Sequence, residues 1–310
     1  MRVETIFEMT SPYRDSFRIK GLRFGNGEKT LAIAGPMRGD EIQQQYICSQ
    51  IVRRLTMAEQ HGRISEGKSI LVIPSCNPFS MNVSRRFWAM DNTDINRMFP
   101  GYSQGETTQR IAAAIFSALE GFEYGIQLAS YYVPGDFVPH VRMITTGYET
   151  LDTAKLFGMK FVSLCKPRPF DTALLNYNWQ IWNTKAFSVY AGCTSRIDST
   201  AASETVDAIM RMMQAAKILT KTVTLSPAYE PAVVDESELL HVKASHAGIF
   251  YRLKSPGSSI ESGDVLSQII DPYNGQCLSE VKSPADGIVF FAHNQPLVFE
   301  NGLIFMIRGM

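Results

Sequence analysis

Long apolar runs and an excess of charge of either sign are missing from this sequence of 310 residues. No apolar run approaches the ~20 residues that a membrane-spanning helix needs, so a membrane partner is not expected. The opening segment, MRVETIFEMTSPYRD, contains acidic side chains and lacks the apolar stretch of a signal peptide. A cytoplasmic location is therefore the expectation.

Charge and cysteine usage exclude further classes. Lys and Arg together number 30, as do Asp and Glu, so the net charge is zero, and no basic run is present. A nucleic-acid partner is therefore not expected. The cysteines are odd in number and form no CxxC pair, which is typical of reduced thiols in a cytosolic protein. They are Cys48, Cys76, Cys165, Cys193 and Cys277.

What the sequence does contain is enough apolar material for a folded core: 45% of residues are apolar and 19% are charged. Short apolar runs at 30–34, 69–73, 124–128, 161–164 and 186–191 predict buried strands. Segments with helical periodicity lie at 40–60, 107–119 and 204–218. This alternation predicts an α/β domain, with a mostly parallel or mixed sheet and helices on both faces.

The pattern changes near Leu219 to short β segments with frequent Gly and Pro turns. The segments around GSSIESGDVLSQIID and SEVKSPADGIVFFA predict a small all-β barrel-sandwich domain. We place an α/β domain at 1–225 and a β-sandwich domain at 226–310. The second unit also resembles a biotinyl/lipoyl-type sandwich. Lys282 lies in no Met-Lys hairpin, so we interpret it as an ordinary strand residue.

Two motifs carry a wider resemblance. GPMRGDE, residues 35–41, ends a predicted strand and begins a predicted helix. RRFWAMDNTDINRMFPG, residues 85–101, matches the pattern R-R-x(4)-D-x-x-D-(L/I)-N-R-x-F-P-G. Together with YGIQLASYY (124–132) and AFSVYAGCTSRID (186–198), they make the chain similar to the succinylglutamate desuccinylase/aspartoacylase family of the zinc carboxypeptidases. The resemblance covers nearly the whole chain and implies a zinc carboxypeptidase-like fold with a hydrolase or deacylase ancestry.

The resemblance assigns substrate-binding roles in the second motif. It implies that Asn96 and Arg97 bind the substrate carboxylate, for which a guanidinium fork beside an amide is well suited. It also implies that a second arginine polarises the scissile carbonyl. Arg86 is the first candidate for this catalytic role, and Arg85 is the next. The alternative is a solvated loop with internal Asp–Arg pairs.

The zinc-site positions of the family are mostly replaced. Glu41 stands at the one ligand position that is retained. Arg38 and Ala129 occupy the positions of the two histidine ligands, and Tyr190 that of the general-base glutamate. A catalytic zinc normally needs three protein ligands. The resemblance therefore implies a degenerate metal site with no zinc, unless the flanks of Ala129 and Tyr190 are misaligned.

Among the histidines, only His140 is expected near the site. It could contact substrate or serve as a replacement acid or base; the alternative is a loop histidine held by hydrogen bonds. The aromatic stretch NYNWQIWNTKAF, residues 176–187, could wall the pocket or pack in the core.

Three functional hypotheses remain. The preferred one is a degenerate family member that binds a small carboxylate or an N-acyl amino acid, with weak or no hydrolysis. The second is an active metal-dependent amidohydrolase of N-acyl amino acids or small peptides, with zinc in a rearranged site built from Glu41 and His140. The third is a partner-binding role of the β unit. A homo-oligomer is compatible with each.

Overall fold

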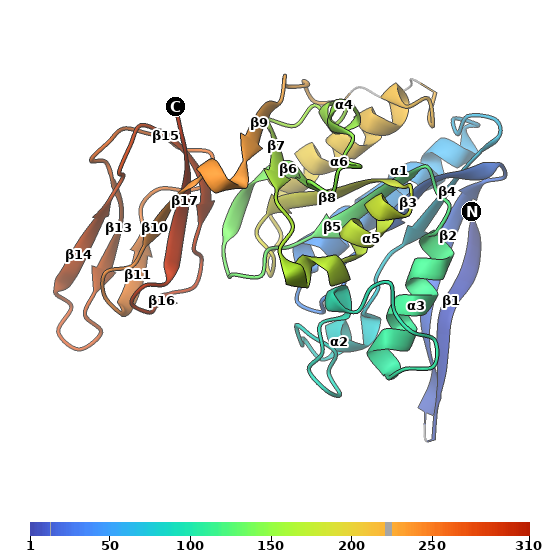
Figure 1. Cartoon of the computed structure of the whole chain (residues 1–310), viewed down its shortest axis with the longest axis horizontal. Coiled ribbons are helices and arrows are strands. Elements are labelled where there is room, and N and C mark those ends of the chain that lie inside the picture. The colour runs from blue at the N-terminus through green and yellow to red at the C-terminus, as the bar shows by residue number, and fades with distance from the viewer. Residues whose placement is uncertain (13, 221–224) are drawn as a thin grey trace.

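The computed structural model describes residues 1–12, 14–220 and 225–310. The α/β part has a long N-terminal hairpin followed by alternating strands and helices (Figure 1). Its strands are β1 (Arg2–Ser11), β2 (Arg14–Gly25), β3 (Glu28–Ala34), β4 (Lys68–Ile73), β5 (Tyr124–Ala129), β6 (Asp136–Ile144), β7 (Phe161–Cys165), β8 (Lys185–Gly192) and β9 (Ala232–Asp235). Its helices are α1 (Ile42–Gln60), α2 (Pro78–Asn82), α3 (Thr107–Leu119), α4 (Leu151–Lys155), α5 (Leu175–Ile181) and α6 (Ser199–Ala215), with the 3₁₀ helices η1 (Ile95–Arg97) and η2 (Pro169–Ala173).

A mixed sheet forms the centre of this part. The strands β4, β3, β5 and β8 run parallel as neighbours in that order. Antiparallel strands flank them: β2 pairs with β4, and β6 pairs with β8. All five strands predicted from apolar runs are present. The mixed α/β class predicted from the sequence is thus confirmed.

Helices cover both faces of the sheet, as predicted. One buried cluster joins α1 and α6 to one face through residues such as Ile47, Ile51 and Ile209. A second cluster joins α3 and α5 to the other face through Ile111 and Trp179. The apolar residues of α1 and α6 recur at helical spacing, so each helix presents one apolar side to the sheet. Helix α6 begins earlier than predicted, because Asp198 caps it by accepting from the backbone N–H of Ala201.

Two strand regions differ from the sequence analysis. The hairpin of β1 and β2 was not expected, because charged residues interrupt its apolar ones on a partly exposed edge. The loop considered for His140 is instead a strand, since 136–144 forms β6, which is almost entirely buried. Pro139 and the polar residues of DFVPHVRMI hide the strand pattern. The pairing of β6 with β8 is irregular between Phe137 and His140, which accommodates the proline.

The C-terminal β part consists of short strands in two layers (Figure 1). It follows the 3₁₀ helix η3 (Glu236–Glu238) and contains β10 (Leu240–Lys243), β11 (Gly248–Arg252), β12 (Ser259–Ile260), β13 (Val265–Ile270), β14 (Cys277–Lys282), β15 (Gly287–Ala292), β16 (Leu297–Val298) and β17 (Leu303–Gly309). Strands β14, β13, β11 and β16 form one layer, while β15, β17 and β10 extend the large sheet through β6. Lys282 is the last residue of β14.

The division at residue 226 stays a prediction. Strand β9, which follows that position, pairs in parallel with β7 and so extends the α/β sheet. The chain enters the C-terminal layers only after η3. Among the described residues, no helix is both long and apolar enough to cross a bilayer.

Candidate functional site

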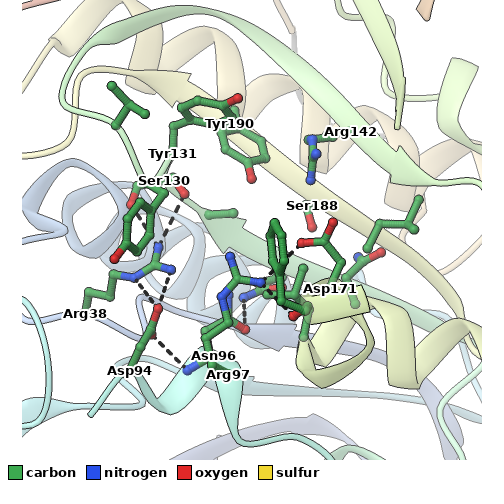
Figure 2. A pocket seen from close by; sticks show the side chains of 18 of the residues that line it. Arg38, Asp94, Asn96, Arg97, Ser130, Tyr131, Arg142, Asp171, Ser188 and Tyr190 are labelled. Carbon is green, nitrogen blue, oxygen red and sulfur yellow. Dashed lines mark hydrogen bonds and ion pairs between the residues drawn. The ribbon is translucent and has the colours of Figure 1, made fainter. Parts of the chain in front are cut away.

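A cavity of about 610 Å³ opens at the carboxyl ends of β5 and β8. Parallel strands bring their carboxyl ends to one edge of a sheet, which is where α/β folds place their ligand sites. Figure 2 shows the polar side chains converging on this space. The lining includes four arginines and two aspartates: Arg38, Arg97, Arg142, Arg168, Asp94 and Asp171.

Sheet register explains how distant residues meet on the floor of the cavity. Gln127 of β5, Ser188 of β8 and Arg142 of β6 are cross-strand neighbours. Two residues further along each strand, Ala129 of β5 lies beside Tyr190 of β8, and Tyr190 is paired in turn with His140 of β6. Side chains two residues apart on a strand share one face, so both rows point to the same side of the sheet.

Arg38 and Glu41 form a buried pair beside the floor. Arg38 Nη1 donates to Glu41 Oε1 at 3.2 Å, and Ser130 Oγ donates to the same oxygen at 2.5 Å. The other oxygen of Glu41 accepts from the backbone N–H groups of Met37 and Arg38. Both side chains of the pair are at most 4% exposed. The carboxylate of Glu41 is thus fully occupied by protein donors.

Asp94 holds the other edge of the Arg38 guanidinium. Arg38 Nη2 and Nε donate to Asp94 Oδ2 at 2.8 and 3.3 Å. Burial opposes the charge on Arg38, but Glu41 and Asp94 outweigh it and raise the pKa of the guanidinium above its ordinary value. Arg38 is therefore a fixed positive charge at this end of the cavity (Figure 2).

The 85–101 loop brings Asn96 and Arg97 to the cavity, as the resemblance implies. Asp94 caps η1 by accepting from the N–H of Asn96, which fixes the orientation of both residues. Asn96 Oδ1 accepts from Gln127 Nε2 at 3.1 Å, so the amide is tied to the floor. Arg97 Nη1 donates to Asp171 Oδ1 at 3.2 Å. Both residues line the cavity.

The two other arginines of the motif lie outside the cavity lining. Arg86 is engaged by Asp40 Oδ2 and by the carbonyl oxygen of Tyr131, each at 2.9 Å. Arg85 is exposed. Gly39 matters here, because a Cβ at this position would lie 2.3 Å from the carbonyl oxygen of Arg85. The backbone of the first motif thus packs directly against the second, and the polarising role of Arg86 or Arg85 stays a prediction.

Tyr190 lines the cavity, whereas His140 lies behind it. The rings of Tyr190 and His140 stack with centroids 5.1 Å apart. Burial raises the pKa of Tyr190, which makes it a poor base at neutral pH. Burial also lowers the pKa of His140 to about 4, and its Nδ1–H donates to the carbonyl oxygen of Val138. The substrate contact proposed for His140 stays untested, but its ring is not part of the lining.

Several lining residues carry no signal in the motifs of the sequence. Arg142 donates through Nε and Nη2 to both oxygens of Glu236 in η3. Arg168 donates through Nε to Asp171 Oδ2 at 3.0 Å. Arg142 lies two residues after His140, so a strand reading of 136–144 would have placed it on the same face. Neither Arg168 nor Asp171 belongs to a recognisable motif.

The catalytic-domain model of the succinylglutamate desuccinylase/aspartoacylase family matches residues 27–216. Among curated protein sequences, none matches this chain at a significant level.

Solved structures show the same fold. A succinylglutamate desuccinylase from Silicibacter sp. TM1040 has a TM-score of 0.81 at 16% identity, over 98% of this chain and 94% of that one. The product-bound ectoine utilization protein EutE (DoeB) from Ruegeria pomeroyi has a TM-score of 0.78 at 16% identity, over 95% and 90%. A succinylglutamate desuccinylase/aspartoacylase from Rhodobacter sphaeroides has a TM-score of 0.77 at 18% identity, over 94% and 89%. The family model covers well over half of the chain, and this protein therefore belongs to the succinylglutamate desuccinylase/aspartoacylase family.

Proposed function

We propose that this family member binds a small carboxylate-bearing molecule in the cavity and hydrolyses it weakly or not at all. The observation that carries the proposal is the position of Arg97, whose guanidinium lines the cavity beside the fixed amide of Asn96. Arg97 uses Nη1 for Phe170 and Asp171. No hydrogen bond between described residues uses its other N–H groups, so these are available to a carboxylate.

The residues at the family's metal position do not fit a catalytic zinc. Glu41 stands at the one retained ligand position, and Arg38 donates both to it and to Asp94. Ala129 carries no donor atom. Within the described part of the chain, no group of three His, Cys, Asp or Glu side chains is arranged to hold a metal ion. A permanent guanidinium charge beside the one remaining ligand opposes binding of a dication.

The residue at the family's general-base position, Tyr190, supports the same proposal. Tyr190 replaces a carboxylate with a phenol whose pKa is raised by burial. Proton abstraction from water is most effective when the pKa of the base lies near the working pH. His140 stacks against Tyr190 and is not among the residues that line the cavity.

Thermal-shift and calorimetric titrations with small carboxylates test the proposal. We expect stabilisation that grows with the logarithm of ligand concentration. The change Arg97→Lys retains the charge but loses the planar fork, so it should weaken binding about tenfold or more. Arg54→Lys, at an ion pair with Asp207 outside the cavity, serves as the matched control.

Two results would contradict the proposal. Binding by Arg97→Lys equal to that of the wild type would remove the assigned carboxylate anchor. One equivalent of zinc in protein purified without chelator, together with release of amine from N-acyl amino acids, would instead support an active metal-dependent amidohydrolase.

A further inference from the structure

Charge is distributed unevenly along the cavity. At one end Arg97 and Arg168 share a single carboxylate, that of Asp171. At the other end one guanidinium, Arg38, is shared by two carboxylates, Glu41 and Asp94. Figure 2 shows Arg38 with Asp94, and Arg97 near Asp171, as two separate clusters. One end therefore has an excess positive charge and the other an excess negative charge.

The third ion pair of the lining does not alter this distribution. Arg142 is held through two of its nitrogens by both oxygens of Glu236, one carboxylate for one guanidinium. Burial opposes the charge of Glu236, but Arg142 outweighs it and lowers the pKa to about 2. Both side chains are thus ionised, and their opposite charges cancel. The pair joins the floor of the cavity to η3.

Burial strengthens the negative end most. The side chains of Glu41 and Asp94 are 2% and 10% exposed, whereas those of Arg97 and Arg168 at the positive end are 26% and 55% exposed. Buried charges are screened much less than exposed ones, so the negative end attracts an ammonium group strongly, while the two arginines offer their free N–H groups to a carboxylate. A cavity with ends of opposite sign orients a dipolar ligand. A ligand with only a negative group would satisfy one end and leave the other uncompensated.

Asp94 has the capacity to accept from a ligand. Its carboxylate offers about four lone-pair sites. Arg38 uses two of them on Oδ2, and the N–H of Asn96 uses one on Oδ1. One site on Oδ1 is left, and Asp94 lines the cavity. Tyr131 and Tyr190 also belong to the lining, and aromatic ring faces attract an ammonium group.

We propose that the ligand is a zwitterion, a free amino acid, with its carboxylate at Arg97 and Arg168 and its ammonium at Asp94. This inference rests on the proposed function, because it takes Arg97 as the carboxylate anchor. It assigns Arg168 and Asp94 as binding residues in addition to Asn96 and Arg97. An N-acyl amino acid lacks the ammonium charge and leaves the excess negative charge at Arg38 unmatched.

Matched ligand triplets test the proposal by isothermal titration calorimetry on the full chain. Aspartate, N-acetylaspartate and succinate share a skeleton and differ at the amine, as do alanine, N-acetylalanine and propionate. We expect the free amino acid of at least one triplet to bind tenfold or more tighter than its two companions. Equal or tighter binding of the N-acetyl or amine-free compounds would overturn the zwitterion inference and leave the carboxylate proposal standing. Absence of binding by every compound would overturn both.

Single substitutions test which residue binds the ammonium group and which binds the carboxylate. Asp94→Asn retains an N-cap acceptor for η1 and removes the charge. It should lower affinity for the free amino acid tenfold or more and leave the amine-free acid unaffected, while Arg97→Lys should weaken both. Asp152→Asn, an exposed carboxylate outside the lining, is the control. Equal losses for both ligand types in Asp94→Asn would overturn the ammonium assignment.

A measurement on the wild type covers the case in which Asp94→Asn does not fold. Raising the pH until the ligand amine is neutral should reduce affinity for the free amino acid to that of the amine-free acid. The amine-free acid should bind equally across the same pH range. A free amino acid whose affinity stays constant as its amine loses the proton would overturn the inference.

Discussion

Arg38 joins two carboxylates beside the cavity. Its guanidinium donates to Glu41, Asp94 and Ser130. Two carboxylates hold it, so its charge is compensated locally and its position is fixed. A buried guanidinium with these partners is stable, but removal of either carboxylate would leave a buried charge with fewer partners.

His140 makes a residue-scale prediction about pH. Its pKa is lowered from 6.5 to about 4 by burial, so the folded protein keeps it neutral where the unfolded chain protonates it. The unfolded state then binds more protons between these values, and stability falls as pH decreases through this window. The shift corresponds to about 3 kcal/mol in full.

Urea unfolding at pH 7 and pH 4.5 measures this effect. His140→Phe should show a smaller loss of unfolding free energy between these pH values than the wild type. His61→Phe, at an exposed position at the end of α1, should retain the wild-type loss. The lower limit of pH 4.5 is the ordinary pKa of a glutamate, so most of the stability that Glu236 gains from its lowered pKa is retained over the measured range. An identical loss of unfolding free energy for His140→Phe and wild type would show that His140 is not the source of the pH dependence.

At the scale of elements, β6 links the cavity to η3, the 3₁₀ helix that precedes the C-terminal strands. Arg142 of β6 lines the cavity, and Glu236 of η3 accepts a hydrogen bond from Arg142. Ser163 of β7 donates to Glu236 Oε1 at 2.8 Å. Burial opposes the ionised carboxylate, but Arg142 holds the pKa of Glu236 at about 2. Three separate elements thus meet at one largely buried ion pair.

Breaking this ion pair on one side should be costly. Arg142→Met leaves the carboxylate of Glu236, which is only 22% exposed, without its partner, and we expect a loss of about 3 kcal/mol in the free energy of unfolding. The double variant Arg142→Met, Glu236→Gln removes both charges and should recover a large part of that loss. Chemical denaturation of the three proteins measures the coupling. A single variant that loses less than ~1 kcal/mol would show that the pair contributes little.

At the scale of the whole molecule, the C-terminal part is joined to the α/β part by main-chain pairing. β15 pairs with β6 through Phe291 and Phe137. These residues share a buried cluster with Phe290 and Met306. The two parts therefore have a common apolar core at their junction, in addition to a continuous sheet (Figure 1).

A shared core predicts cooperative unfolding. We expect one calorimetric transition for the full chain, with the van't Hoff and calorimetric enthalpies equal. Phe291→Ala should lower the stability of the entire molecule by roughly 3–5 kcal/mol and shift that single transition as a whole. Leu278→Ala, at a partly exposed position on β14, is the control. Two resolved transitions, with only the second moved by Phe291→Ala, would contradict the prediction.

The sequence by itself determined the α/β class, the change to short β strands near residue 219 and the contiguous 85–101 motif. Local patterns carry these features, since apolar periodicity and turn residues act over a few positions. The resemblance pointed to Asn96 and Arg97, which Asp94 orients from within the same motif, and their binding of a carboxylate stays a prediction.

Only the tertiary structure decided which other side chains reach the cavity. The register of β5, β8 and β6 places Arg142 on the floor and sets His140 behind Tyr190. Asp40 and the Tyr131 carbonyl engage Arg86, which the motif alone would assign to the substrate. Arg168 meets Arg97 solely because η2 packs beside η1 and both guanidiniums converge on Asp171. Such contacts join residues far apart in sequence, and no local pattern encodes them.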